Sequence, residues 1–309
     1  MQVLVLGGTS FVGRWIVEDL LGRGHTPTLF NRGRTGQELY PGVERLVGDR
    51  DTGDYASIRD RQFEAVVDVS AYLPRHVSQA AEALGGHRGR YLLISTGMVY
   101  DRLTAGDAIT EASPLLPPHR ASEDITDDTY GPLKVACEQD LVARFADRAT
   151  TVRPGWVVGP HDYSDQLTYW IRRSAGKTVA APGRLDRPVQ VIDARDLARL
   201  VVLLIEQNRS GAYNAVGPST PLTFGELIRA CGPAKPISVA DDTVEFPLCL
   251  PDDSWDVLFK ISAAAARRVG MTHTPLAQTV ADTRAWDIQR GEPALVTGPS
   301  ESEEAALLT

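Results

Sequence analysis

Hydrophobic residues in the first half of the chain fall into short apolar runs, separated by segments with helical periodicity. The runs predict β-strands at residues 2–6, 27–31, 43–47, 65–69 and 91–95, and the segments between them predict helices at 12–22, 55–59 and 74–84. Strands that alternate with helices are joined by right-handed crossovers, which produce a parallel sheet. The unbroken apolar character of the runs at 65–69 and 91–94 is typical of strands that are covered on both faces.

The pattern becomes less regular after the fifth strand. A polar, proline-containing stretch at 101–128 predicts a surface loop or a lid. The rest of the chain predicts helices at 129–146, 165–175, 194–207, 223–230, 262–269 and 276–287, and strands at 150–153, 189–192, 212–215 and 236–239.

This order of elements predicts an α/β fold, a Rossmann-type doubly wound parallel sheet with a smaller α+β substrate lobe. We expect a dinucleotide-binding domain at 1–160, to which the chain returns at about 188–217. The substrate lobe is then formed by 161–187 and 218–290. The acidic tail at 291–309 is expected to be disordered or to end in a short helix at 303–308.

Composition narrows the class of protein. The chain has 309 residues, 43% of them hydrophobic, and a formal net charge of −8, which argues against non-specific nucleic-acid binding. Its three cysteines have neither metal-binding spacing nor a disulfide pattern, which indicates a reducing compartment. The first strand leaves no room for a signal peptide, and no apolar run has membrane-spanning length. We therefore expect a cytoplasmic protein with a small-molecule substrate, no metal, no membrane contact and no nucleic-acid partner.

The chain begins with a strand that leads through a glycine turn into a helix. Gly7, Gly8 and Gly13 would let the main chain approach a pyrophosphate, and the free N–H groups of the helix would bind it. Ser10 stands where a third, middle glycine is usual, so an ordinary tight turn is the alternative interpretation. The predicted cofactor contacts here are Gly7, Thr9, Ser10, Phe11, Val12 and Gly13.

The end of the second strand bears on the choice of cofactor. NAD sites usually place Asp or Glu there to bind the ribose 2′-hydroxyl, but this chain has Asn31 followed by Arg32 and Arg34. Guanidinium groups pair well with a 2′-phosphate, which favours NADP, with NAD as the alternative. After the third strand, Asp49 is either an acceptor for the adenine amino group or only a turn residue.

Candidate catalytic residues follow the fifth strand. Tyr130 and Lys134 are spaced to lie on one face of a helix. An ammonium near a phenol lowers its pKa from about 10, which would let Tyr130 exchange a proton with a substrate oxygen. Lys134 would also hold the nicotinamide ribose. Thr96, at the carboxyl end of a central strand, would polarise the same substrate oxygen.

Together these motifs resemble the extended branch of the short-chain dehydrogenase/reductase superfamily, the NAD-dependent epimerase/dehydratase family. The resemblance covers about residues 1–290. Its landmarks, in order, are residues 7–13, Asp49, Thr96, Ile109-Thr110-Glu111, Tyr130 with Lys134, residues 153–160 and residues 191–198. The Gly-Gly-Thr-x-Phe-x-Gly turn is similar to an atypical subgroup that includes plant chloroplast stem-loop-binding proteins and uncharacterised bacterial reductases.

The resemblance implies a catalytic triad of Thr96, Tyr130 and Lys134, and a homodimer that associates through helices of the main sheet. It also implies that residues 153–160 lie beside the nicotinamide and begin the substrate wall. The further cofactor contacts it implies are Ser70, Ala71, Pro154, Gly155 and Val157. The substrate contacts it implies are Gly97, Met98, Trp156, His161 and Tyr163, although Trp156 also suits the core and the last two suit the surface.

One departure from the family pattern restricts the reaction. Gly97 and Met98 follow Thr96 where dehydratases have Asp and Glu, so elimination of water from a sugar is not expected. The leading hypothesis is a reductase that uses NADPH to reduce a carbonyl of a sugar-like or secondary-metabolite substrate, with Tyr130 as general acid/base. The alternatives are a nucleotide-sugar epimerase with tightly bound NAD and a non-catalytic cofactor-sensing or RNA-binding protein.

Overall fold

A parallel sheet of seven strands forms the centre of the computed structural model, which describes residues 1–104, 106, 108–239, 244–250 and 252–308. Its strand order is β11-β6-β5-β4-β1-β2-β3, and every neighbouring pair is parallel. This arrangement confirms the predicted Rossmann-type fold. The strands are β1 Gln2–Leu6, β2 Thr26–Asn31, β3 Glu44–Val47, β4 Ala65–Asp68, β5 Arg90–Ile94, β6 Ala149–Pro154 and β11 Gly211–Ala215.

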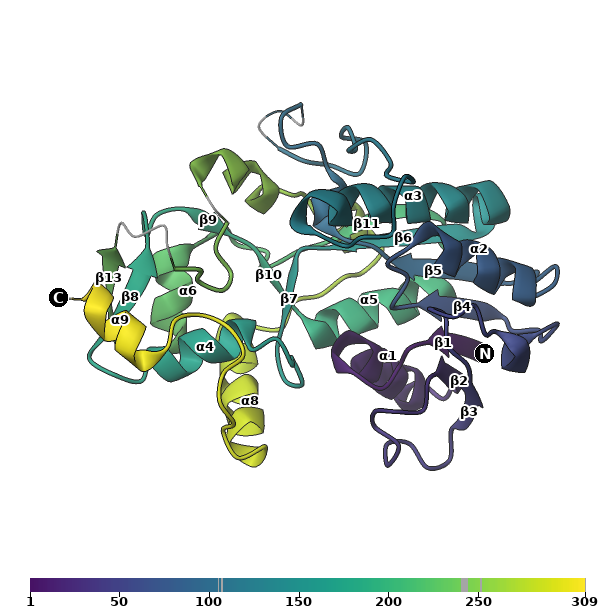
Figure 1. Ribbon diagram of the computed structural model, residues 1–309, viewed down its shortest axis with the longest axis horizontal. Helices are drawn as coiled ribbons and strands as arrows, with labels where there is room; N and C mark the ends of the chain where they lie inside the picture. The colour runs from purple at the N-terminus through teal and green to yellow at the C-terminus, as the bar shows by residue number, and fades with distance from the viewer. Residues whose placement is uncertain (105, 107, 240–243, 251, 309) are drawn as a thin grey trace.

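Helices cover both faces of this sheet (Figure 1). They are α1 Phe11–Gly22 and α5 Ala194–Glu206 on one face, and α2 Pro74–Ala83 and α3 Asp127–Phe145 on the other. Side chains alternate between the faces of a strand, so Val3 and Val5 pack with α1 and α5 while Leu4 and Leu6 pack with α2 and α3. Burial on both sides explains the unbroken apolar runs in the sequence.

A second hydrophobic cluster lies at the other end of the molecule (Figure 1). Trp170 and Phe224 are at its centre, with ring centroids 5.1 Å apart. Its helices are α4 Gln166–Arg173, α6 Phe224–Cys231, α8 Leu276–Gln289 and α9 Glu301–Leu307, and its paired strands are β8 Thr178–Pro182 with β13 Lys235–Val239 and β9 Pro188–Val189 with β12 Leu222–Thr223. The remaining pair, β7 Trp156–Val158 with β10 Val191–Asp193, connects this end to the sheet.

Several local predictions differ from the structure. The strand expected at 189–192 is divided between two partners, because β9 pairs antiparallel with β12 whereas β10 pairs parallel with β7. The helix expected at 55–59 is a 3-10 turn, η1 Ala56–Ile58, and the one at 262–269 is shortened to α7 Ala264–Arg268. The other 3-10 segments are η2 Gly97–Val99, η3 Ala146–Arg148 and η4 Asp253–Phe259.

The C-terminal tail is held against the second cluster. Ser300 and Glu303 form a capping box at the start of α9. The Glu304 carboxylate accepts a hydrogen bond from the Ala180 amide at 2.9 Å and lies 3.4 Å from the Arg173 guanidinium. Of the two expectations for this segment, the short helix is therefore the one observed.

Candidate cofactor and catalytic site

The glycine turn between β1 and α1 is shaped for close backbone approach. Gly7 and Gly8 have φ angles of 118° and 95°, which side chains disfavour, and a Cβ added to Gly13 would lie 2.7 Å from the Gly8 nitrogen. Ser10 is the N-cap of α1, but its hydroxyl makes no capping hydrogen bond. The first N–H groups of α1 are therefore available to an anion.

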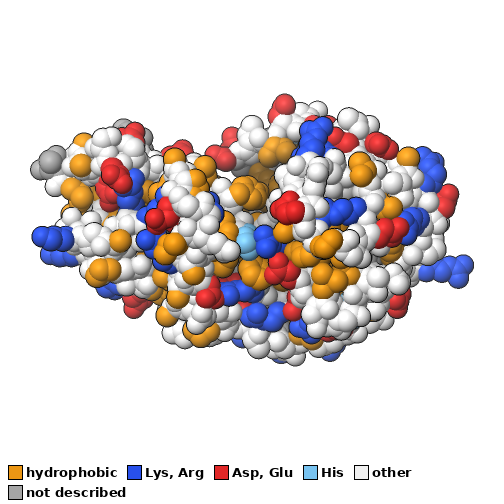
Figure 2. All heavy atoms as spheres, turned by 90° about the horizontal axis from the view of Figure 1, so that it is seen from below, with side chains coloured by type: hydrophobic (Ala, Val, Ile, Leu, Met, Phe, Trp, Pro, Cys, Tyr) orange, Lys and Arg blue, Asp and Glu red, His pale blue; other side chains and the backbone are white. Residues whose placement is uncertain are grey.

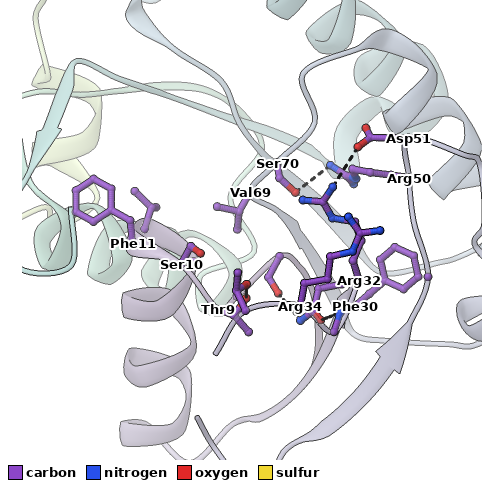
Figure 3. Close-up of a pocket in the computed structure, with 18 of the residues that line it drawn as sticks. Thr9, Ser10, Phe11, Phe30, Arg32, Arg34, Arg50, Asp51, Val69 and Ser70 are labelled. Atoms are coloured by element: carbon purple, nitrogen blue, oxygen red, sulfur yellow. Dashed lines mark hydrogen bonds and ion pairs between the residues drawn. The ribbon is translucent and has the colours of Figure 1, made fainter. Parts of the chain in front are cut away.

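This turn lines a cavity of about 340 Å³, which we call the glycine-turn cavity. Every contact predicted at residues 7–13 lines it, as do Asn31, Arg32, Arg34, Ser70 and Tyr163. Figure 3 shows Arg32 and Arg34 beside the turn, with Arg50, Asp51 and Ser70 on a neighbouring wall. The cavity therefore joins the ends of β1, β2 and β4.

Asn31 and the two arginines form the end of the cavity at β2. The Asn31 side-chain oxygen accepts a hydrogen bond from the Gly33 amide at 2.9 Å, so this residue shapes the turn that presents the arginines. The Arg32 guanidinium lies 3.6 Å from the Asp51 carboxylate, and both side chains are more than half exposed. No ion pair or hydrogen bond to Arg34 is found among the described residues, so its charge remains available to a ligand.

Asp49 is placed differently from the prediction. It does not line the glycine-turn cavity, whereas its neighbours Gly48, Arg50 and Asp51 do. The Asp49 carboxylate instead accepts a hydrogen bond from the Asp51 amide at 3.0 Å, while the backbone of Asp49 pairs with that of Asp54. One oxygen of this carboxylate therefore stabilises the tight turn after β3, which is the alternative interpretation of Asp49.

A buried ion pair supports the cavity wall next to that turn. Arg50 donates to both carboxylate oxygens of Asp68 at 2.9 and 3.1 Å and to the Ser70 hydroxyl at 3.2 Å. The Tyr91 hydroxyl donates to the same carboxylate at 2.7 Å. Burial alone would raise the pKa of Asp68, but Arg50 and these hydrogen bonds hold it below its usual value. Asp68 therefore stays ionised and fixes Arg50.

His76 also lines the glycine-turn cavity, and its sequence context gave no signal of this. The residue is only 2% exposed, neither ring nitrogen makes a hydrogen bond within the described chain, and Nε2 lies 3.4 Å from the Asp51 carboxylate. Burial, together with Arg50 and Arg75, lowers its pKa to about 4, so the imidazole is neutral. A neutral imidazole has one donor and one acceptor nitrogen to offer.

Thr96 and Tyr130 line a second cavity of about 270 Å³, which we call the tyrosine cavity. Tyr130 lies in the first turns of α3, a helix begun by the Thr126–Thr129 capping box. Thr96 follows β5, and its hydroxyl accepts a hydrogen bond from the Met98 amide at 3.1 Å, which leaves its own proton free to be donated. The ring centroids of Tyr130 and Tyr72 are 6.4 Å apart, and Tyr72 lines the glycine-turn cavity.

Lys134 is on the same helix as Tyr130 but lines neither cavity. Its ammonium is buried and donates to the carbonyl oxygens of Ala71 at 2.8 Å and Ile94 at 2.7 Å. The prediction that Lys134 lowers the pKa of the phenol is wrong for this structure. Burial raises the pKa of Tyr130 to about 12, and the Thr96 side chain opposes this only in part.

The remaining predicted residues divide between the two cavities and the protein interior. Gly97, Met98, Pro154, Gly155 and Trp156 line the tyrosine cavity, so Pro154 and Gly155 lie there and not at the glycine turn. Ala71 contributes its carbonyl to Lys134, and Val157 pairs with Ile192 in the β7–β10 ladder; neither lines a cavity.

His161 lines neither of these two cavities. Its ring is packed between Trp15 and Trp286, with centroid distances of 5.5 Å to each. Burial and the nearby Arg14 guanidinium lower its pKa to about 4. His161 thus contributes to packing between α1 and α8.

No group of three metal-ligating side chains occurs among the described residues. None of the described helices is long and apolar enough to cross a membrane.

The sequence profile of the NAD dependent epimerase/dehydratase family matches residues 61–216. The chain belongs to this family. Among curated proteins, the chloroplast stem-loop binding protein of 41 kDa b from Arabidopsis thaliana is 26% identical over 251 residues, which are 75% of this chain. The chain spans 63% of that relative, less than two thirds of its length.

Solved structures share the fold. A UDP-glucose 4-epimerase from Thermotoga maritima, determined with UDP-glucose, is 16% identical with a TM-score of 0.70, covering 95% of this chain and 100% of that one. The Bordetella bronchiseptica enzyme WbmH, determined with NAD⁺, is 24% identical with a TM-score of 0.66, covering 94% and 99%. These likenesses describe the fold, and the reaction depends on the side chains at the two cavities.

Proposed function

We propose that the protein is an NADP-dependent reductase that converts a substrate carbonyl to an alcohol. The observation that carries the proposal is the basic end of the glycine-turn cavity, where Arg34 has an unpaired charge and Asn31 replaces the usual acid. A 2′-phosphate is an anion that a guanidinium binds well, whereas a carboxylate at this position would repel it. A reductase draws on the free pool of NADPH, while an epimerase recycles one bound NAD.

The residues at the glycine-turn cavity fit such a cofactor. Gly13 lets the start of α1 pack against the backbone of Gly8, and the first N–H groups of α1, which Ser10 does not cap, would face a pyrophosphate. The unpartnered imidazole of His76 would gain hydrogen bonds from a polar ligand in this cavity. When bound, the reduced nicotinamide supplies the hydride that is transferred to the carbonyl carbon.

Tyr130 would donate the proton in this reaction. Because its pKa is raised to about 12, the phenol is protonated at neutral pH and can give its proton to the oxygen of the reduced carbonyl. Thr96 would orient and polarise the same oxygen through its free hydroxyl proton. Lys134 uses two of its three N–H donors on Ala71 and Ile94, so one would remain for a ribose hydroxyl of the cofactor.

Two experiments test this proposal. The first analyses the freshly isolated protein for bound nucleotide, and we expect substoichiometric cofactor. The second follows NADPH absorbance with a panel of aldehydes and ketones, and we expect steady oxidation of NADPH with one alcohol formed per NADPH consumed. Stoichiometric NAD in the isolated protein, together with no net consumption of NADPH, would contradict a reductase and favour the nucleotide-sugar epimerase.

The name of the chloroplast relative raises RNA binding as a second candidate. The net charge of −8 opposes it, because RNA affinity depends on contacts between cations and phosphates. On the face drawn in Figure 2, Lys and Arg side chains are interspersed with Asp and Glu and do not form one basic patch. A filter-binding assay with a stem-loop RNA at 150 mM salt, an ionic strength of roughly physiological value, would test this candidate. Submicromolar affinity would support it.

A further inference from the structure

The walls of the tyrosine cavity differ from those of the glycine-turn cavity. Seven apolar side chains form most of the lining: Met98, Pro154, Trp156, Leu250, Leu258, Phe259 and Ile261. None of the described residues that line it is Lys, Arg, His, Asp or Glu. The residues outside the described ranges include no Lys or Arg either, so they cannot supply a cation to this cavity.

Few polar side chains line the tyrosine cavity. Thr96 and Tyr130 provide hydroxyl groups there. The third polar side chain, Gln190, is occupied on both sides, because its amide donates to the Ile261 carbonyl at 2.9 Å and accepts from the Ile261 amide at 3.1 Å. A substrate would therefore find hydrogen bonds at its reacting oxygen and mainly apolar contacts elsewhere.

Arg187, a buried cation that bonds to the backbone of the lining residue Leu250, is not available to a substrate. Arg187 is 7% exposed and donates to the Asp256 carboxylate at 2.8 Å and to the Leu250 carbonyl at 3.2 Å. Its charge is paired and it stabilises the backbone behind the cavity wall. A sugar nucleotide carries a diphosphate, which proteins bind with cations or aligned backbone N–H groups, and the lining supplies no cation for it.

The wall also contains an aromatic pair that suits a flat ligand. The rings of Trp156 and Phe259 have centroids 5.0 Å apart and planes inclined by 37°. Trp156 is only half-buried, so part of its ring faces the cavity. A cavity of about 270 Å³ exceeds the roughly 150 Å³ engineered cavity that holds benzene, which leaves room for an aromatic ring with a short side chain.

We propose that the substrate is an aldehyde or ketone with an uncharged aromatic or alicyclic body, and not a nucleotide sugar. The proposal rests on the proposed function. The carbonyl oxygen would lie against Thr96 and Tyr130, and the apolar body would contact Trp156, Phe259 and Leu258. Hydride from NADPH adds to the carbonyl carbon and the proton from the Tyr130 hydroxyl adds to the oxygen, which gives the alcohol and NADP⁺.

Matched aldehydes test the substrate class. We expect kcat/KM for phenylacetaldehyde to exceed that for glyceraldehyde by about tenfold or more, because burial of a ring in an apolar cavity favours binding. Equal values, or a preference for glyceraldehyde, would overturn the proposal. Leu250→Lys should lower kcat/KM for phenylacetaldehyde by about tenfold, because it places a charge in the apolar cavity. Leu185 is also half-buried but lies outside the cavity, so Leu185→Lys is the matched control.

A binding measurement separates failure of this inference from failure of the proposed function. Calorimetry on the NADPH-loaded protein is performed with 2-phenylethanol and with UDP-glucose. Binding of 2-phenylethanol but not UDP-glucose supports the apolar substrate class even where no aldehyde is reduced, in which case only the proposed reaction fails. Tighter binding of UDP-glucose overturns the inference, whether or not NADPH is oxidised.

Discussion

The ring centroids of Tyr72 and Tyr130 lie 6.4 Å apart, and each tyrosine lines a different cavity. Tyr72 follows β4 and borders the glycine-turn cavity, whereas Tyr130 is on α3 and borders the tyrosine cavity. The Lys134 ammonium lies 5.7 Å from the Tyr72 ring centroid. The two rings therefore mark the place where a cofactor and a substrate would meet.

Removal of the Tyr72 ring should hydrate this junction. Burial is the largest cause of the raised pKa of Tyr130, and Tyr72 itself raises it further. We expect Tyr72→Ala to move the pKa of Tyr130 back toward 10 and to lower kcat by about tenfold, since a wetter site weakens its electrostatics. Tyr72→Phe keeps the ring and is the control. Spectroscopic titration of the tyrosines, combined with steady-state kinetics, measures both effects; loss of activity in both variants would assign the effect to the Tyr72 hydroxyl.

The protonation state of Tyr130 predicts opposite pH dependences for the two reaction directions. Reduction needs the phenol, which predominates below the pKa of about 12, so kcat for reduction should be flat from pH 6 to 9. Oxidation needs the phenolate, so its rate should rise by about tenfold per pH unit over the same range. Tyr130→Phe should lose about 10²-fold in kcat while its affinity for NADPH is retained. A reduction rate that falls between pH 7 and 8 would contradict this assignment.

Lys134 is expected to contribute to stability as well as to activity. Replacing it with methionine leaves the Ala71 and Ile94 carbonyls without their donor, at a cost of about 1–3 kcal/mol in the free energy of unfolding. Lys177 is exposed, so Lys177→Met is the matched control, with an expected change within about 0.5 kcal/mol. Urea denaturation compares the two variants. Equal stability of Lys134→Met and the control would show that these hydrogen bonds contribute nothing measurable.

His76 provides a test that separates folding from ligand binding. Its ring nitrogens make no hydrogen bond within the described chain, so His76→Phe removes no such bond and should change the free energy of unfolding by no more than about 1 kcal/mol. If the imidazole binds the cofactor, the same substitution should weaken NADPH binding by about tenfold in calorimetry. Unchanged affinity would restrict His76 to filling space in the cavity wall.

Local sequence signals were sufficient to predict the sheet, the glycine turn that lines one cavity, and the helix that carries Tyr130 at the other. The glycine turn needs residues within one strand–helix connection, and Tyr130 and Lys134 need only helical spacing. These features depend on neighbours in sequence, so periodicity and turn chemistry describe them well.

The features that could not be predicted depend on contacts between distant segments. Lys134 lines neither cavity, and carbonyls after β4 and on β5 bind its ammonium. One oxygen of the Asp49 carboxylate binds within its own turn, and His76 lines the cavity through packing of α2. The apolar side chains of the tyrosine cavity come largely from η4 and the residues next to it. These lie more than 100 residues beyond Tyr130, in a segment that carries no recognisable motif.

The central claim is that Arg34 and Arg32 select NADPH, and the ratio of dissociation constants for NADH and NADPH tests it most directly. Calorimetry should give NADPH a Kd at least about tenfold lower than that of NADH, since charged hydrogen bonds contribute about 1.5–3 kcal/mol. The Arg32→Ala/Arg34→Ala variant should lose that preference by weakening NADPH alone, and Asp51→Asn, which removes a nearby negative charge, should strengthen NADPH. A wild-type preference for NADH, or equal losses for both cofactors in the double variant, would contradict the account.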